Sequence, residues 1–298
     1  MRKLLGAAAI LAVIGLGGFL WASAPQTIDP AALPSHVGDK ANGELLYHVG
    51  GCIACHKPAA ADKAKDPLLP SGGAALKTPI GTFYPPNLTP DPETGIGAWT
   101  DIQFVNAMQR GVSPGGENLI PAFPYTSYTR MKVEDVLDIK AYLMSLAPVK
   151  AENKPADLSM AWLVRRSVGV WKRLALQPPL APDPSRDAVW NRGYYLVNGP
   201  GHCAECHTPR NLLMIGDAAR AFAGGPHPEG KGKVPSLLDL IGRGKYTDSQ
   251  DLASALKDGE MGGYDNLSSS GMGDVQENLA KLPDADIKAI AEYLATLK

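Results

Sequence analysis

Hydrophobic and polar positions follow two different patterns along this chain. At the N-terminus, Arg2 and Lys3 precede an uncharged run of 18 residues from Leu4 to Trp21. Beyond it, apolar residues recur every three or four positions in short segments, separated by stretches rich in glycine and proline. Spacing of this kind is typical of short amphipathic helices. The pattern predicts an apolar segment at residues 1–24 and a mainly α-helical body.

The N-terminal run is either a membrane anchor or a secretory signal. A signal has an apolar region of about 7–15 residues, whereas a spanning helix needs about 20. Ala22-Ser23-Ala24 has the small residues of a cleavage site, but Pro25 directly after it fits a peptidase poorly. We therefore favour an uncleaved anchor. In both cases the rest of the chain is exported, and no later segment is long and apolar enough to span again.

The pattern of the body repeats itself. The same 86 residues separate His56 from Tyr142 and His207 from Tyr293. Both tyrosines lie in the apolar stripe of an amphipathic helix that opens on acidic residues, as the helix dipole favours. The stripes are Val136, Ile139, Leu143 and Leu146, and Ile287, Ile290, Leu294 and Leu297. Further helices are expected around 43–47 and 192–196, so each half has the same order of elements.

All four cysteines lie in two Cys-x-x-Cys-His motifs. The motifs are Cys52-Ile53-Ala54-Cys55-His56 and Cys203-Ala204-Glu205-Cys206-His207. This spacing is typical of c-type haem attachment. Two thiols one short turn apart can add to the two vinyl groups of a porphyrin, and the adjoining histidine can bind the iron. We therefore predict two covalently bound haem c groups, with His56 and His207 as proximal ligands.

Three other uses of these cysteines fit less well. Disulfides suit an exported protein but do not explain a histidine after each pair. A zinc site can use two Cys-x-x-Cys pairs, but the pairs here lie far beyond the usual spacing. A thioredoxin-like motif needs a βαβ setting, and no such pattern surrounds either pair.

Composition agrees with two small haem domains. The formal net charge of −1 gives no basic excess for nucleic acid. A haem replaces much of a hydrophobic core, so a half with many of the 32 glycines and 26 prolines can fold around it. We predict a mainly α fold with two tandem class I-like cytochrome c domains. The expected segments are an anchor or signal at 1–24, domain 1 at 25–150, a helical and proline-rich linker at 151–187, and domain 2 at 188–298.

The linker carries two tryptophans, Trp162 and Trp171. We expect a short amphipathic helix followed by an extended stretch around residues 177–184. The simpler interpretation is that both indoles pack between the domains. The alternative is that this segment docks a partner protein or the membrane surface.

Methionine is a common distal ligand in electron carriers because His/Met ligation raises the potential. In the second half we favour Met272, between Gly271 and Gly273, in a flexible stretch where the backbone can approach the haem closely. Met214 lies near the motif and is expected near the haem edge. Met261 lies at the end of an expected helix.

The distal ligand of the first half is less clear from the pattern. Met108 lies inside the helical pattern of residues 102–110 and Met144 in the terminal helix, so we favour Met131. Shifting Met272 back by the repeat offset of 151 points to Pro121, near Phe123, rather than to Met131. Bis-histidine ligation is an alternative in principle. However, the remaining histidines are expected to be surface residues: His36, His48, His202 and His227.

The chain resembles the multihaem cytochrome c subunits of membrane-bound periplasmic alcohol-type dehydrogenases. The resemblance covers about residues 38–298 and depends on several strings. These are Gly50-Gly51-Cys52, Asn87-Leu88-Thr89-Pro90-Asp91, Pro121-Ala122-Phe123-Pro124-Tyr125, Trp190-Asn191-Arg192-Gly193 and His207-Thr208-Pro209-Arg210-Asn211. Those subunits usually carry three haem motifs, and this chain has two. They also commonly have methionine at the position of Phe123. The resemblance supports Met272 and implies a dehydrogenase partner.

These observations favour an electron carrier over an enzyme. Two irons with full His/Met ligation exchange electrons but offer no open position to a substrate. The expected flow runs from a periplasmic dehydrogenase to a downstream cytochrome or terminal oxidase of a respiratory chain. The protein is expected at the periplasmic face of the inner membrane. The alternative is a dihaem enzyme, peroxidase-like or thiosulfate-oxidising, that uses haem 1. Arg210 and Asn211 are expected either at a haem edge or in a surface turn.

Overall fold

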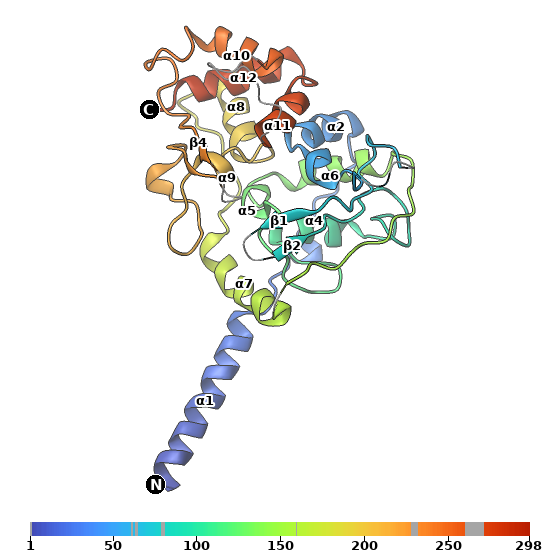
Figure 1. Cartoon of the computed structure of the whole chain (residues 1–298), viewed down its shortest axis with the longest axis vertical. Helices are drawn as coiled ribbons and strands as arrows, with labels where there is room; N and C mark the ends of the chain where they lie inside the picture. The colour runs from blue at the N-terminus through green and yellow to red at the C-terminus, as the bar shows by residue number, and fades with distance from the viewer. Residues whose placement is uncertain are drawn as a thin grey trace.

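The computed structural model consists of a helical body and a single helix that extends away from it (Figure 1). It describes residues 2–60, 62, 65–78, 81–158, 160–227, 232–259 and 271–298. The extended helix is α1 (Arg2–Ala22), and its side chains lie almost entirely outside the body. Within the described residues, α1 is the one helix long and apolar enough to cross a membrane, over Lys3–Ala22 with a mean hydropathy of 2.2.

The body contains two sets of helices in the same order, linked by one more helix. The first set is α2 (Lys40–Val49), α3 (Cys52–His56), α4 (Asp101–Arg110), α5 (Tyr125–Tyr128) and α6 (Val133–Leu143). The second is α8 (Ala188–Asn198), α9 (Ala204–His207), α10 (Ser249–Asp258), α11 (Gly271–Leu279) and α12 (Asp284–Ala295). Between them lies α7 (Ala161–Ala175).

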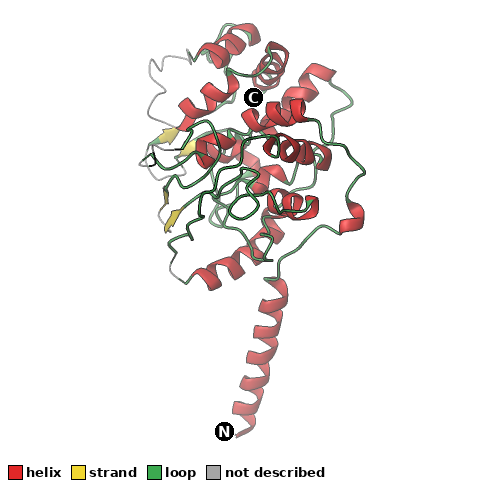
Figure 2. Ribbon diagram, turned by 90° about the vertical axis from the view of Figure 1, so that its right-hand side faces the viewer, coloured by secondary structure: helices red, strands yellow, loops and turns green. Residues whose placement is uncertain are grey.

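Strands are few and short, as Figure 2 shows. Strands β1 (Leu76–Thr78) and β2 (Gly81–Phe83) pair antiparallel, with Leu76 opposite Phe83. Strands β3 (Gly225–Pro226) and β4 (Lys233–Val234) form an equivalent pair in the second half. Two single 3₁₀ turns lie at Pro30–Ala32 and Ala218–Arg220. The described chain is therefore mainly helical, as the sequence predicted.

Helices α2, α4, α8 and α10 begin where polar side chains satisfy their first backbone N–H groups. Asp39 accepts hydrogen bonds from the backbone N–H groups of Ala41 and Asn42 at the start of α2. Thr100 and Gln103 form a reciprocal capping box at the start of α4. Asp187 and Asp248 accept from the first turns of α8 and α10. These caps fix the ends of helices that are too short to be stable alone.

Two helix crossings build the body, and each depends on a glycine. Helix α2 packs on α6, and α8 packs on α12. A Cβ atom on Gly43 would lie 1.9 Å from the carbonyl oxygen of Asp138, and one on Gly193 would lie 1.8 Å from that of Ala289. Only glycine allows such a close approach. The predicted terminal helices are confirmed as α6 and α12, and the helices expected upstream of each motif as α2 and α8.

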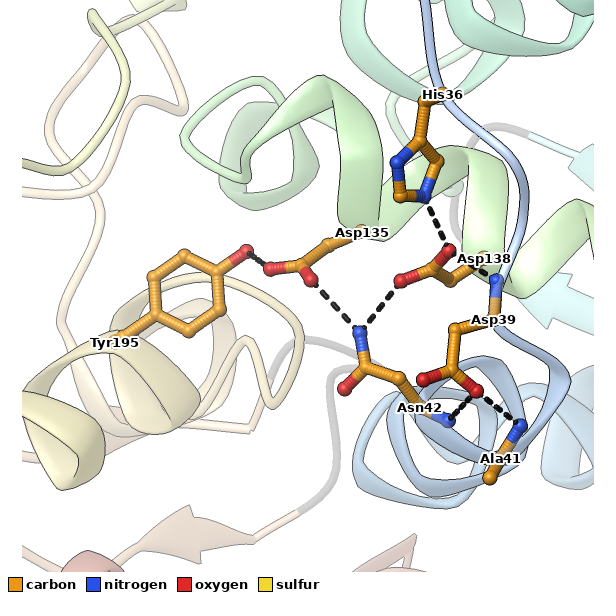
Figure 3. A network of polar contacts seen from close by, with 7 residues as sticks. All are labelled: His36, Asp39, Ala41, Asn42, Asp135, Asp138 and Tyr195. Atoms are coloured by element: carbon orange, nitrogen blue, oxygen red, sulfur yellow. Dashed lines mark hydrogen bonds and ion pairs between the residues drawn. The ribbon is translucent and has the colours of Figure 1, made fainter.

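A polar network ties the N-terminal segment and both sets of helices together (Figure 3). The buried carboxylate of Asp138 accepts from His36 Nε2 at 2.6 Å, from the backbone N–H of Asp39 at 2.7 Å and from Asn42 Nδ2 at 2.7 Å. Asn42 also donates to Asp135, which accepts a hydrogen bond from the hydroxyl of Tyr195. Since Tyr195 lies on α8, this network extends from the first half into the second.

The hydrophobic core is continuous across both halves. One cluster contains Leu46 of α2, Leu143 of α6, Leu196 of α8 and Leu294 of α12, each at most 4% exposed. The halves therefore share one apolar interior, rather than meeting only through surface contacts.

Candidate haem-binding sites

Each Cys-x-x-Cys-His motif is wound into a single helical turn. Helix α3 begins after Gly51, whose φ of 55° is the left-handed conformation that glycine adopts easily. Helix α9 begins after Cys203 and ends at His207. Residues three apart lie on the same side of a helical turn. The two thiols of each motif therefore project from one side, with the histidine directly after them.

Both motif histidines are held in the same orientation. His56 Nδ1 lies 2.8 Å from the carbonyl oxygen of Pro86, and His207 Nδ1 lies 2.8 Å from that of Pro235. A carbonyl only accepts, so Nδ1 carries the proton and Nε2 keeps its lone pair for a metal. An outer hydrogen bond of this kind orients an imidazole ligand toward its metal.

Burial keeps both imidazoles neutral, as ligation requires. Desolvation lowers the pKa of His56 to about 4, against the hydrogen bond to Pro86, which raises it. Desolvation likewise lowers the pKa of His207 below its ordinary value. Burial also raises the pKa of the Cys52 thiol and of the Cys203 thiol to about 12.

This donor set fits covalent haem. Thiols, an oriented histidine and a following backbone acceptor occur twice, in the same order. In the part of the chain that the structure describes, no three His, Cys, Asp or Glu side chains gather into a metal cluster. When bound, haem supplies one-electron redox chemistry at the iron.

The two favoured methionines have different surroundings. Met131 is fully buried, its carbonyl accepts from Gln109 Nε2 at 2.9 Å, and its Cγ would lie 3.5 Å from a Cβ on Gly199. Met272 is half-buried in the first turn of α11, so the stretch expected to be flexible is helical from Gly271 onward. Ser270 and Met261 lie outside the described residues.

The other methionine candidates have the following places. Met108 is buried inside α4, and Met144 caps the C-terminus of α6. Met214 is 63% exposed and has a φ of 59°. Phe123 contacts the rings of Tyr125 and Tyr128.

The loops that lead into the two motifs contact each other reciprocally. A Cβ on Gly50 would lie 3.5 Å from the carbonyl oxygen of Pro200, and one on Gly201 would lie 3.4 Å from Val49 Cγ1. Shifting Gly50 and Val49 by the repeat offset of 151 gives Gly201 and Pro200. His202 Nε2 lies 3.1 Å from the carbonyl oxygen of Gly50. The two attachment sites are therefore neighbours across a local twofold-like contact.

Glu205, inside the second motif, was not recognised from the sequence as a contact between the halves. Its carboxylate accepts from the hydroxyl groups of Thr126 and Ser127 in the first half and from Arg210 at 2.7 Å. Burial raises the pKa of Glu205, but the Arg210 guanidinium and the Thr126 hydroxyl outweigh burial and hold that pKa below its ordinary value. Arg210 therefore forms an ion pair with the Glu205 carboxylate. Asn211 Oδ1 accepts a hydrogen bond from the backbone N–H of Leu213 in its own turn.

Of the histidines expected at the surface, His36 is exposed, whereas His48 and His202 are half-buried. His36 pairs with the buried Asp138, and His48 Nδ1 lies 3.2 Å from Asn278 Oδ1 of the second half. His202 contacts the ring of Tyr128 as well as Gly50. Each is a bridge between segments distant in sequence, which a single-sequence pattern does not show. His227 is half-buried.

The two tryptophans of the linker differ from each other in their surroundings. Trp171 Nε1 donates to the carbonyl of Leu213 at 2.8 Å, in the loop after the second motif. Trp162, in contrast, is 62% exposed, so it does not pack between the halves. The expected helix is confirmed as α7, and residues 177–183 after it have no regular structure.

Comparison with known proteins agrees with this site. The cytochrome c family model matches residues 40–147. A "Diheme cytochrome c-type" protein of Cereibacter sphaeroides is 40% identical over 299 residues, covering 99% of this chain and 98% of that protein. The fructose dehydrogenase cytochrome subunit of Gluconobacter japonicus is 34% identical, covering 91% of this chain and 55% of that subunit.

A further relative is the cytochrome c subunit of a quinone alcohol dehydrogenase from Gluconacetobacter polyoxogenes, at 36% identity. It matches 86% of this chain, and the chain spans 55% of it. The chain therefore covers about half of these dehydrogenase subunits but nearly all of the dihaem relative. These matches support electron transfer. With two complete motifs and a relative of equal extent, the chain belongs to the dihaem c-type cytochromes and carries two c-type haems.

Proposed function

We propose that this protein carries electrons from a periplasmic dehydrogenase to a downstream cytochrome or terminal oxidase of a respiratory chain. The observation that carries the proposal is the pair of identical histidine settings, in which Pro86 and Pro235 orient His56 and His207 with Nε2 available to iron. The similarity to cytochrome subunits of fructose and alcohol dehydrogenases supports a dehydrogenase as the donor.

In this proposal Cys52 and Cys55 hold haem 1 and Cys203 and Cys206 hold haem 2. Met131 and Met272 would supply the second protein ligand of each iron. With both sides of each iron occupied by protein, the irons exchange electrons without an open position for substrate. At the repeat offset of 151, Met131 corresponds to Leu282, which is a buried core residue of the second half.

The contact between the motif loops supports electron exchange between the two haems. Gly50 lies against Pro200, and Gly201 against Val49, directly before the two attachment motifs. The loops that carry the two attachment sites therefore lie next to each other. The polar bridges from His202 and Glu205 fix the halves in one arrangement.

We further propose that α1 anchors the body to the periplasmic face of the inner membrane. Its 20-residue apolar stretch is about 30 Å long, which matches the hydrocarbon thickness of a bilayer. Arg2 and Lys3 at its start favour the cytoplasm.

The ligand set is tested by the absorption spectrum of the oxidised, haem-loaded protein. Methionine ligation gives a weak far-red band, and we expect Met131→Leu and Met272→Leu each to remove about half of it. Met108→Leu is the matched control, because it makes the same change at a buried methionine inside α4. A wild-type haem that is high-spin and readily binds carbon monoxide would reject the carrier and favour an enzyme.

The donor is tested by purifying the native complex from membranes under mild conditions. We expect a dehydrogenase subunit to co-purify, and its substrate to reduce both haems. A co-purified dehydrogenase that, supplied with its substrate, does not reduce the cytochrome would contradict the proposal.

A further inference from the structure

Helix α7 presents large apolar side chains to solvent. Trp162 is 62% exposed, Leu163 43% and Leu174 60%, and Met160 just before the helix is 73% exposed. Leu163 and Leu174, eleven residues apart, lie on one helix face next to Trp162. The opposite face is buried against the body through Val168, Gly169, Lys172 and Ala175. Single exposed apolar residues are ordinary, but a set along one helix face indicates an interaction surface.

The charges of α7 are all positive. The helix contains Arg165, Arg166, Lys172 and Arg173 and no acidic residue. Two of them serve the body: Lys172 Nζ donates to the carbonyl of Arg110 at 2.7 Å, and Arg165 donates to that of Asn118 at 3.0 Å. Arg166 and Arg173 lie on the outward side with the apolar residues, and Arg166 stacks over the Trp162 ring at 5.9 Å. The surface therefore combines an indole, leucines and two arginines.

The end of α1 is fixed directly to α7. Arg173 Nε donates to the carbonyl of Ala22 at 2.7 Å, and its guanidinium lies 5.0 Å from the centre of the Trp21 ring. A Cβ on Gly169 would lie 2.1 Å from the carbonyl oxygen of Ser23, so the two backbones touch. Figure 1 shows α7 at the end of the body from which α1 extends.

We propose that α7 lies in the headgroup region of an anionic bilayer, as a second membrane contact beside α1. The inference depends on the proposed anchor. If Lys3–Ala22 fills the hydrocarbon core, then Ala22 lies at the membrane–water boundary, and so does the helix that touches it. Tryptophan is favoured at this depth, leucines enter the acyl boundary, and arginines bind lipid phosphates.

Position decides between lipid and protein as the occupant of this surface. A helix in contact with Ala22 and Ser23 has lipid headgroups beside it as soon as α1 spans the bilayer. Its outward charges, Arg166 and Arg173, complement the phosphates of phosphatidylglycerol. Two contacts also fix how the body is turned on the membrane, which one spanning helix alone does not do.

Site-specific photo-crosslinking in lipid nanodiscs tests this inference. The haem-loaded full chain carries p-benzoylphenylalanine at one position and is placed in discs of phosphatidylcholine and phosphatidylglycerol. We expect lipid adducts at Trp162→benzoylphenylalanine and at Leu11→benzoylphenylalanine within α1. Val189→benzoylphenylalanine is the control, since it is 41% exposed on α8, away from α1. No lipid adduct above background is expected there.

The outcomes separate the anchor from the second contact. Adducts at position 11 but only background at position 162 would overturn the inference and leave the anchor standing. Background at both positions would overturn both. Crosslinking of position 162 to a protein in native membranes, without lipid adducts in discs, would also reject the bilayer as the occupant. In the same discs, we expect Arg166→Glu to lower the lipid adduct yield at position 162 because it replaces attraction to the phosphates by repulsion.

Discussion

Gly43→Ala tests whether the crossing of α2 and α6 depends on a bare backbone. The new Cβ would lie 1.9 Å from the carbonyl oxygen of Asp138 and 2.5 Å from its carbonyl carbon. Both atoms belong to the backbone of α6, so no rotamer change can relieve the overlap. The methyl group is accommodated only if the two helices move apart.

Two opposing effects set the size of the change. Alanine is favoured over glycine within a helix by about 1 kcal/mol. Overpacking costs about 1–3 kcal/mol and more where backbone must shift, and separation of α2 from α6 also loosens the core around Leu46 and Leu143. The steric cost is therefore larger, and we expect a net loss of about 2 kcal/mol or more in the free energy of unfolding. For a domain of this size the melting temperature falls by roughly 4–8 °C.

The assay is denaturant unfolding of the haem-loaded variant, followed by helical circular dichroism. Gly193→Ala makes the same change at the equivalent crossing and should behave alike, since its Cβ would lie 1.8 Å from the carbonyl oxygen of Ala289. Gly271→Ala in α11 is the matched control, because nothing lies within 4 Å of its Cβ position. A Gly43→Ala protein as stable as the wild type would refute the close-approach argument.

Three further predictions concern charged groups. The hydrogen bond to Asp138 raises the pKa of His36. The pair therefore stabilises the fold below the ordinary pKa of histidine and loses this effect as the pH rises through the raised pKa. We expect His36→Gln to lower the urea midpoint more at about pH 6 than at about pH 9. Glu205→Gln leaves Arg210 without its carboxylate partner and should lower the free energy of unfolding by about 1–3 kcal/mol. The control Glu93→Gln, at the exposed pair with Lys150, should change it by less than about 1 kcal/mol. Equal effects of the two substitutions would contradict a stabilising role for Glu205. Burial lowers the pKa of Lys172 to about 8. Above that pH the unfolded chain binds more protons than the folded chain, so the wild type should gain stability from about pH 8 to about pH 10.5. Lys172→Met should remove this rise, and a plot of stability against pH parallel to that of the wild type would contradict the prediction.

Local patterns predicted the helices and the motif residues, because these depend on neighbours in the sequence. The stripe around Tyr142 and Tyr293 predicted α6 and α12, and the spacing of cysteines and histidine indicated haem attachment. The carbonyl partners of the motif histidines were not predictable in this way. Pro86 lies 30 residues after His56, and Pro235 lies 28 residues after His207, at the end of irregular segments.

Polar contacts between distant segments were also missed. His36 was expected at the surface, and its partner Asp138 is 102 residues away on the buried face of α6. Glu205 occupies a variable position of its motif, and its hydroxyl donors lie 78 and 79 residues earlier. Trp162 was expected in an interface because a large aromatic residue is usually buried. The exposure of Trp162 depends on how α7 packs beside α1, and the local sequence pattern of α7 does not show that packing.

The reciprocal contact between Gly50 and Pro200 and between Gly201 and Val49 is the geometry of a symmetric dimer. In this protein the two subunits are consecutive parts of one chain, so dilution cannot separate them. Because the two halves belong to one chain, residues at equivalent positions of the two halves can differ from each other. Serine and glutamate now meet at one side, Ser127 with Glu205, while histidine and asparagine meet at the other, His48 with Asn278. A duplicated ancestor that assembled with itself would account for both the retained symmetry and its decay.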